Sequence, residues 1–420
     1  MDINGLLTGV QCECGKLHTC DIRYVYIESG AISRLREICK DYNNVLIVAD
    51  ENTFSAAGEL TLKALNGKTV ERVIFSGDEI LVPDENAVNT VTENLGNAEI
   101  IIGIGSGVIQ DLCKYISFCN NLPYIIVATA PSMDGYASDG AAMILGGMKV
   151  TKAAGLPIAI IGDVDVLKNA PIDMIKAGYG DIIGKFSALN DWKLSHVVNG
   201  EYFCDYIYNV TYSQIEATLE LADGIVKRNE KSIEALMKAL VVIGIMMSFA
   251  GSSRPASGSE HHFSHFFEIT GIVDNEEYFP HGIDVGYSTV ITCELRQKLR
   301  SLPFGDKVCR LSDEDYRNKV NEIYKSVADG CIELQEKVGF YNKDLSAVYT
   351  EKEAEIKRIL SETPTADEIK QMLAKVGLDI NEFYSLYSEQ KINDATLYAK
   401  DLKDRYTVLW LYYDYCLGVE

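Results

Sequence analysis

The stretch AEIIIGIGSGVIQDLCKYISFCN, residues 98–120, decides the fold class. Its first half is an apolar, β-branched run without polar alternation, which is typical of a strand covered on both faces of a sheet. The glycines of GIGSG follow at once, and the second half has the apolar spacing of a helix. A buried strand that passes through glycines into a helix indicates a parallel sheet of the α/β class.

Similar units lie on both sides of this stretch. NVLIVAD at 44–50 and RVIFSG at 72–77 are strand-like runs that precede it, and PYIIVATAPS at 123–132 follows it. Helix-like segments separate them, and one of these, residues 84–96, begins after Pro83 with Asp84 as a capping residue. Four strands, each followed by a helix, favour one sheet covered by helices on both faces.

The pattern changes after the fourth predicted strand. Residues 141–167 contain two apolar runs around LGGMK, whose glycines suit a tight hairpin turn. From Pro171 onward, apolar residues recur at helical spacing almost throughout. The sequence therefore predicts an α/β dinucleotide-binding domain over residues 1–165 and an all-α metal- and substrate-binding domain over residues 166–420, with a cleft between them.

The composition restricts the partners and the compartment. Acidic residues outnumber Lys and Arg by 61 to 39, and the formal charge is −22. Nucleic acid and anionic membranes repel such a chain at long range, so neither is expected as a partner. The N-terminus lacks the features of a signal peptide, and the apolar runs are too short or too glycine-interrupted to span a bilayer. Eleven cysteines without framework spacing favour reduced thiols, and we expect a cytoplasmic protein.

A group of potential metal ligands lies near the N-terminus. Cys12, Cys14, His18 and Cys20 lie within nine residues and offer four zinc ligands. Their spacing is not the paired C-x-x-C of a zinc knuckle, and the alternation over residues 10–20 fits an early strand or hairpin. We expect a strand or hairpin here, with a small structural metal site as the alternative.

Small and polar residues follow the predicted strands, where ligands of open parallel sheets bind. GIGSG at 103–107 would let backbone N–H groups approach a phosphate, although it is not the full dinucleotide fingerprint and a tight turn is the alternative. Asp50 either accepts hydrogen bonds from a ribose or caps the following helix. The loop ATAPSMDGYASDG at 128–140 is either a ligand loop or a polar turn.

The histidines are concentrated in one region. GSEHHFSHFFE, residues 258–268, holds three of the six histidines within five residues. His261 and His265 share one face of a helix, whereas the histidine next to His261 points about a quarter turn away and is expected to be an ordinary exposed or packed residue. His281 follows in FPHGID, and Asp181 in YGDIIGK offers a carboxylate. An acid and two histidines with an open position form a catalytic site for a divalent metal; His265 is either a ligand or a catalytic imidazole beside it.

Together these motifs resemble the sn-glycerol-1-phosphate dehydrogenase family, within the superfamily of metal-dependent polyol dehydrogenases and dehydroquinate synthases. The resemblance covers roughly residues 10–295, and it is most specific in PSMDGYAS combined with SGSEHHFSH. It implies the dehydroquinate synthase-like fold and the NAD- or NADP-dependent interconversion of dihydroxyacetone phosphate and sn-glycerol 1-phosphate. The AraM-like bacterial members are homodimers of similar length. Its motifs in this chain are VADENTFSAAG, GSGVIQDLCKY, TAPSMDGYAS, GDIIGKFSALNDW, SRPASGSEHHFSHFFE and HGIDVG.

The resemblance also implies roles for individual residues. The metal ligands would be Asp181, His261 and His281, with Zn²⁺ expected and Ni²⁺ or iron as alternatives. Asp134, Asp181 and His265 would contact the substrate. The metal would stabilise the alkoxide that forms when hydride reaches C2, and His265 or a bound water would supply the proton. The expected contacts of the nucleotide are Asp50, Gly105, Ser106, Gly107, Asp111, Thr129, Ser132 and Ser138.

The substrate phosphate requires a cation, for which Arg254 and Lys185 are the candidates. Glycerol dehydrogenase shares the expected fold and metal ligands, but PSMDGYAS differs from the corresponding loop of that family. Dehydroquinate synthase and a non-catalytic metal- or nucleotide-binding protein are further alternatives. Asp50 favours NAD, because a carboxylate repels the 2′-phosphate of NADP. NADP stays open as the alternative cofactor.

Overall fold

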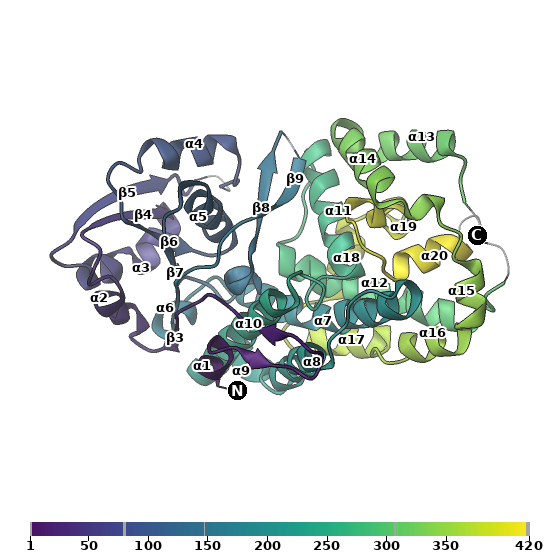
Figure 1. Cartoon of the computed structure of the whole chain (residues 1–420), viewed down its shortest axis with the longest axis horizontal. Coiled ribbons are helices and arrows are strands. Elements are labelled where there is room, and N and C mark those ends of the chain that lie inside the picture. The colour runs from purple at the N-terminus through teal and green to yellow at the C-terminus, as the bar shows by residue number, and fades with distance from the viewer. Residues whose placement is uncertain (1, 79–80, 147, 306–307, 309, 417–420) are drawn as a thin grey trace. The chain divides into compact units, whose positions relative to one another are not determined.

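The computed structural model describes residues 2–78, 81–146, 148–305, 308 and 310–416 (Figure 1). The chain forms two compact units. One contains Met1–Tyr179 and Glu216–Ser253, and the other contains Gly180–Ile215 and Arg254–Glu420. The predicted division into domains at residue 165 stays a prediction.

The first unit is built on a parallel sheet of six strands, as the apolar runs predict. The order across the sheet is β3-β10-β7-β6-β4-β5, and every pairing is parallel. The four predicted strands are confirmed, and two further strands at one side of the sheet were not predicted. The bounds are β3 Tyr24–Glu28, β4 Asn44–Asp50, β5 Thr69–Phe75, β6 Ile100–Gly105, β7 Tyr124–Ala128 and β10 Ala159–Asp163.

Helices cover both faces of this sheet, as Figure 1 shows for α3 (Glu51–Ala64) and α5 (Gly107–Asn120). Ile47 and Ile102 share one buried apolar cluster with Ala57 of α3. On the opposite face a side chain at Gly103 would come within 2.9 Å of the Cys113 sulfur of α5. Strands β6, β7 and β10 are buried at every position and are therefore mostly apolar, whereas β3 and β5 at the two sides of the sheet include exposed residues.

The predicted hairpin is confirmed as β8 (Gly140–Leu145) and β9 (Met148–Ala153), which pair antiparallel. Gly146 adopts a φ of 61° in the turn, a conformation that favours glycine, while Gly147 lies outside the described residues. The remaining short elements of the first unit include the hairpin β1–β2 described below, and also α1 Ile3–Leu7, α2 Leu35–Ile38, α4 Glu85–Glu93, η2 Gly135–Ala137, α6 Val164–Leu167 and α9 Ala222–Val226.

Helix α10 (Glu230–Ala250) belongs to the first unit, and it corrects the expectation that the apolar runs of this chain are too short or too glycine-interrupted to span a bilayer. By length and composition it is long and apolar enough to cross a membrane. However, 72% of its most apolar window is buried inside the protein, as in the core helix of a globular fold. The apolarity of α10 therefore has an explanation in packing.

The described secondary structure of the second unit is helical, as predicted. Three of its helices carry the histidines and the acid singled out above: α7 Ile172–Asn199, which begins in the first unit, α11 Ser259–Asp274 and α12 His281–Ser301. The others are α8 Asp205–Leu219, which ends in the first unit, α13 Asp313–Tyr324, α14 Ala328–Val338, α15 Ser346–Glu351, α16 Glu353–Leu360, α17 Ala366–Ala374, α18 Ile380–Leu386, α19 Glu389–Tyr398 and α20 Val408–Cys416.

Candidate active site

Three helices of the second unit bring Asp181, His261 and His281 together. Their potential ligand atoms all lie within 4.8 Å of one another. The Nε2 atom of His261 is 3.6 Å from Oδ1 of Asp181, and the rings of His261 and His281 are 5.0 Å apart. One carboxylate and two imidazoles suit zinc, iron or nickel, so this donor set fits the metal that the sequence predicts.

Glycines explain how α7 and α12 approach closely enough to form this cluster. At Gly180 a side chain would come within 2.3 Å of the Gly282 carbonyl oxygen. One turn later, a side chain at Gly184 would come within 2.5 Å of a Val285 methyl group. The two glycines flank Asp181 in the sequence, and His281 is the first residue of α12. Because Gly180 and Gly184 have no side chains, α7 and α12 can pack closely enough to bring Asp181 near His281.

His265 lies beside the three ligands, one helical turn after His261. Its ring is 6.1 Å from that of His261 and 5.5 Å from that of His281. It is only partly buried, and it does not belong to the cluster whose ligand atoms share the 4.8 Å limit. This position suits the second of the two roles left open by the sequence, an imidazole next to the metal ligands.

Lys185 forms a buried ion pair with Asp181. Its Nζ atom is 2.5 Å from Oδ1 of Asp181, and both side chains are completely buried. Burial by itself would raise the pKa of Asp181, but the charges of Lys185, His261 and His281 outweigh it and lower the pKa. Asp181 is therefore ionised at neutral pH, as a metal ligand must be.

Glu260 is a residue of this site that the sequence did not single out. Its Oε1 atom is 2.7 Å from Nδ1 of His261 and also accepts the backbone N–H of Gly258 at 2.8 Å. Burial would raise the pKa of Glu260, but the hydrogen bonds from His261 and from the Gly258 N–H lower it, so Glu260 is an ionised acceptor. Since a carboxylate only accepts, Nδ1 of His261 carries the proton and Nε2 is left for a metal. The available signal was an acid directly before the histidine.

His262, the neighbour of His261, is completely buried, as one of the two expected alternatives had it. Both of its ring nitrogens are without a hydrogen-bond partner among the described residues. Burial lowers the pKa of His262 well below its usual value, so the ring is neutral. Of these two adjacent histidines, His261 is hydrogen-bonded to a carboxylate, whereas His262 has no hydrogen-bond partner among the described residues.

Both candidate cations for the substrate phosphate already have carboxylate partners. Arg254 donates to both oxygens of Glu201, from Nε at 2.7 Å and from Nη2 at 2.5 Å, and it also donates to the Tyr406 carbonyl. Its side chain is buried, and Lys185 is paired with Asp181 as described. A phosphate at either cation would have to compete with an existing ion pair.

In the first unit, several of the predicted nucleotide contacts lie together at the carboxyl ends of the sheet strands. Strand β6 lies between β4 and β7. Asp50 and Gly105 are the last residues of β4 and β6, and Thr129 directly follows β7, so all three lie at the carboxyl ends of adjacent strands. The Thr129 N–H donates to the Gly105 carbonyl at 3.1 Å. The chain moves from β4 outward to β5 and then returns to the other side of β4 with β6. Such a switch point is where open α/β sheets bind ligands.

Two of these residues have structural tasks at that edge. Asp50 accepts the Thr53 N–H at 2.9 Å and donates its own N–H to the Thr53 hydroxyl, a capping box for α3. At Gly105 a side chain would come within 2.6 Å of Ile109, so glycine allows the strand to end against α5. Both structural alternatives raised by the sequence, a helix cap at Asp50 and a tight turn at Gly105, are therefore present.

Lys114 is a further residue that the sequence did not single out. Its side chain is completely buried in α5. Its Nζ atom bonds to Asp111 at 3.3 Å, to the Ser138 hydroxyl at 3.2 Å and to the carbonyls of Gly135 and Gly140. It thus holds together two predicted nucleotide contacts and the loop that follows β7. A lone lysine within an apolar helix was the available signal.

The same loop contains the other predicted contacts. Ser132 and Asp134 are 7% and 8% exposed, so the loop is packed at these two residues. Helix α10 lies against it, because a side chain at Gly244 would come within 2.6 Å of the Asp134 carbonyl oxygen. Helix α10 therefore packs against the backbone of this loop at Asp134.

Comparisons with known proteins agree with this architecture. A family model described as iron-containing alcohol dehydrogenase matches residues 26–171. A glycerol-1-phosphate dehydrogenase (NAD(P)+) of Halalkalibacterium halodurans is 30% identical over 421 residues, which cover 97% of this chain and 95% of the relative. The chain belongs to the glycerol-1-phosphate dehydrogenase family.

One further relative and one solved structure are also similar to this chain. A glycerol-1-phosphate dehydrogenase (NAD(P)+) of Methanosarcina mazei is 37% identical over 58% of this chain and 69% of its own length. The crystal structure of glycerol dehydrogenase from Schizosaccharomyces pombe aligns with a TM-score of 0.54 at 20% identity, over 87% of this chain and 91% of that chain. At this identity the second likeness concerns the fold alone.

Proposed function

We propose that this chain is an NAD(P)- and metal-dependent oxidoreductase that reversibly reduces dihydroxyacetone phosphate to sn-glycerol 1-phosphate. The observation that carries the proposal is the cluster of Asp181, His261 and His281 in a chain of the glycerol-1-phosphate dehydrogenase family. We further propose that it acts in the cytoplasm as a homodimer, as the resemblance of its motifs implies.

The proposed metal ligands are Asp181, His261 and His281, and zinc, nickel and iron are all compatible with them. A divalent cation bound there would act as a Lewis acid toward the carbonyl oxygen of the substrate. Lys185 keeps Asp181 ionised, and Glu260 fixes the tautomer of His261. These two residues prepare the donor atoms before any ligand binds.

We propose that the remaining roles follow from position. His265 is a partly buried imidazole beside the ligands, and it would deliver the proton to the developing alkoxide. Asp134 would contact the substrate. The nicotinamide would supply the hydride, with its dinucleotide at the sheet edge formed by Asp50, the turn from Gly105 to Asp111, and the loop that contains Thr129, Ser132 and Ser138.

Arg254 is proposed as the cation for the phosphate, and the proposal is testable by selectivity. The Arg254→Gln variant should raise KM for dihydroxyacetone phosphate about tenfold, as expected for one lost charged hydrogen bond. Its KM for free dihydroxyacetone should change little. An equal rise for both ketones would exclude Arg254 as the phosphate contact, and would indicate that its pair with Glu201 supports the fold instead.

A glycerol dehydrogenase acting on unphosphorylated polyols is the second candidate. The observation in its favour is that both candidate cations are paired with carboxylates.

The oxidation of NADH and NADPH decides between the two candidates when dihydroxyacetone phosphate and dihydroxyacetone are compared at equal concentration. A higher kcat/KM for the phosphorylated ketone supports the proposed function. Equal or faster turnover of the free ketone would assign the chain to glycerol dehydrogenases, and no turnover of either would contradict both.

A further inference from the structure

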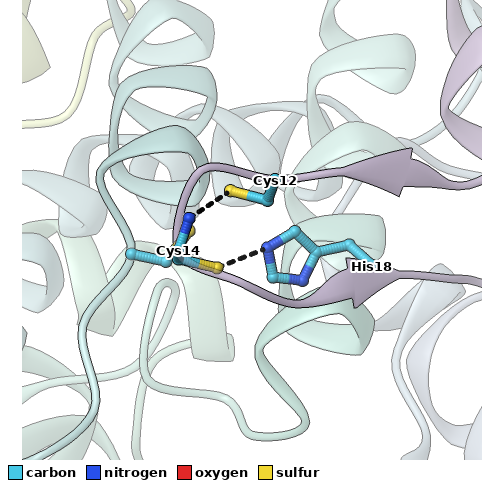
Figure 2. Close-up of side chains that lie close together, drawn as sticks. Cys12, Cys14 and His18 are labelled. Carbon is cyan, nitrogen blue, oxygen red and sulfur yellow. Dashed lines mark hydrogen bonds between the residues drawn. The ribbon is translucent and has the colours of Figure 1, made fainter.

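A second group of metal-ligand side chains lies near the N-terminus, in residues that the proposed reaction does not use. Strands β1 (Val10–Gln11) and β2 (Leu17–His18) form an antiparallel hairpin with two residue pairs, Val10 with His18 and Gln11 with Leu17. Two pairs are too few to hold a hairpin in water without further support. Cys12, Cys14 and His18 gather at the turn of this hairpin (Figure 2).

The turn brings the three side chains together. The Cys12 N–H donates to the Lys16 carbonyl and the Gly15 N–H donates to the Cys12 carbonyl, both at 3.0 Å. Gly15 has a φ of 86°, which glycine adopts at little cost. The chain therefore reverses tightly enough to place the side chains of Cys12 and Cys14 on the same side as the ring of His18, as Figure 2 shows.

The distances suit one tetrahedral metal ion. The ligand atoms of Cys12, Cys14 and His18 all lie within 4.8 Å of one another, and Sγ of Cys14 is 3.4 Å from Nε2 of His18. Zinc bonds of about 2.3 Å to sulfur and about 2.0–2.1 Å to nitrogen place such a pair about 3.6 Å apart at the tetrahedral angle. The Cys14 N–H also points to Sγ of Cys12 at 3.5 Å, where it would stabilise a thiolate.

His18 has the tautomer that a metal ligand requires. Its Nδ1 atom is 3.1 Å from the Phe249 carbonyl oxygen, which can only accept, so Nδ1 carries the proton. Nε2, which faces Cys14, is then the nitrogen left to bind a metal. The ring is 1% exposed and stacks on Phe249 at 5.4 Å, so this orientation is fixed. A backbone carbonyl behind the second nitrogen is the usual support of a ligating histidine.

The sequence offered Cys20 as a fourth ligand, but the cluster does not include it. A soft donor set of two thiols and one imidazole selects zinc over magnesium or calcium. Thiols remain available as ligands where the compartment keeps them reduced.

We propose that Cys12, Cys14 and His18 bind a zinc ion, in a second metal site made of residues different from Asp181, His261 and His281. The two thiols lose their protons when the zinc ion binds. One further ligand completes the coordination of the ion. The ion fastens the turn of the hairpin to His18, and through Phe249 to helix α10. Its task is structural, because two thiolates and a histidine on a short hairpin hold the ion without a substrate.

Metal analysis of the full-length enzyme tests the site. The Cys14→Ser and Cys12→Ser variants should each contain one zinc per chain fewer than Cys119→Ser, a matched control at an exposed cysteine of α5. Both variants should melt at a lower temperature than the control. Substitution of the remaining cysteines one at a time would identify a fourth protein ligand.

Cobalt provides a second readout, which is measured first in the wild-type enzyme. Co²⁺ added to the reduced, metal-free wild-type enzyme should produce a near-ultraviolet sulfur-to-cobalt charge-transfer band. The His261→Ala variant should retain this band, whereas Cys14→Ser should lose it. An absent band in the wild type, an unchanged zinc content in the cysteine variants, or a Cys12–Cys14 disulfide in the enzyme purified under reducing conditions would overturn the proposal.

Discussion

The two groups of potential metal ligands in this chain are built in opposite ways. Asp181, His261 and His281 come from three helices and are separated by up to 100 positions, whereas Cys12, Cys14 and His18 lie within seven residues of one hairpin. The first group has a hard carboxylate with a buried lysine behind it, and the second has soft thiols, one of them exposed. The comparison suggests that the first group serves chemistry and the second serves stability.

Their supporting residues teach the same lesson. Lys185 and Glu260 set the charge of Asp181 and the tautomer of His261 before a metal arrives, at the cost of burying the Lys185–Asp181 ion pair and the Glu260 carboxylate. In the hairpin a backbone carbonyl and a ring stack are the described support of His18. A site that must polarise a substrate needs tuned ligands, and a site that only fastens a turn needs ligands in the right place.

The largest effect is expected for His261→Ala. It removes one of three ligands from the helix cluster, and losing several kcal/mol of Lewis-acid stabilisation corresponds to about a 1,000-fold drop in kcat/KM. The matched control is His262→Leu, at the adjacent buried histidine, which should retain activity within about threefold if packing is preserved. Steady-state assays with dihydroxyacetone phosphate measure both variants. Similar losses in the two would mean that α11 fails to fold, not that a ligand is missing.

The next effect concerns stability and the ion pair behind Asp181. Lys185→Met leaves a buried carboxylate without its lysine, which should lower the unfolding free energy of the metal-free enzyme by about 3 kcal/mol. A bound cation replaces the lost charge, so the loss should be smaller after metal is added. Urea denaturation with and without metal measures the difference, with Lys231→Met, at an exposed lysine, as the control. An equal loss of unfolding free energy with and without metal would show that Lys185 does not act through the metal site.

A smaller effect is expected for Glu260→Gln, which keeps the size of the side chain but removes its charge. Partners of ligating histidines usually contribute 10- to 100-fold, so metal affinity should fall by about that factor. Activity at saturating metal should fall much less. Competition with a chelator measures the affinity, and an unchanged dissociation constant would contradict the assigned role of Glu260.

The smallest effect on activity is expected in the hairpin. Cys14→Ser should leave kcat/KM for dihydroxyacetone phosphate within about twofold of the wild type, since the variant retains Asp181, His261 and His281. A loss comparable to that of His261→Ala would remove the distinction between a chemical and a structural cluster. The assay uses enzyme at a temperature well below its melting point.

The sequence predicted the four consecutive strands β4 to β7 of the sheet and missed β3 and β10. NVLIVAD and AEIIIGIG are apolar throughout and were recognised, whereas the half-exposed YVYIE of β3 was missed. Strand β10 was missed because its apolar run follows a hairpin and was read together with it. Local patterns identify strands, but the order across the sheet depends on contacts between distant residues.

The sequence predicted the metal ligands of the site, but it did not predict the residues that contact and position them. The family motifs pointed to Asp181, His261 and His281, which the fold brings together. Lys185 was expected to bind phosphate but is paired with Asp181, and neither Glu260 nor Lys114 was singled out, because burial and hydrogen-bond partners are tertiary facts. In the hairpin, spacing alone could not show that Cys20 lies outside the cluster.

Metal dependence of the reaction tests the central claim most directly. The enzyme is stripped of metal, and the reduction of dihydroxyacetone phosphate by NADH and NADPH is measured while Zn²⁺, Ni²⁺ or Fe²⁺ is added back to wild type and to His261→Ala. The account predicts that activity disappears on stripping and that a suitable metal restores it in the wild type alone. Full activity in the metal-free enzyme, or equal recovery in His261→Ala, would contradict it.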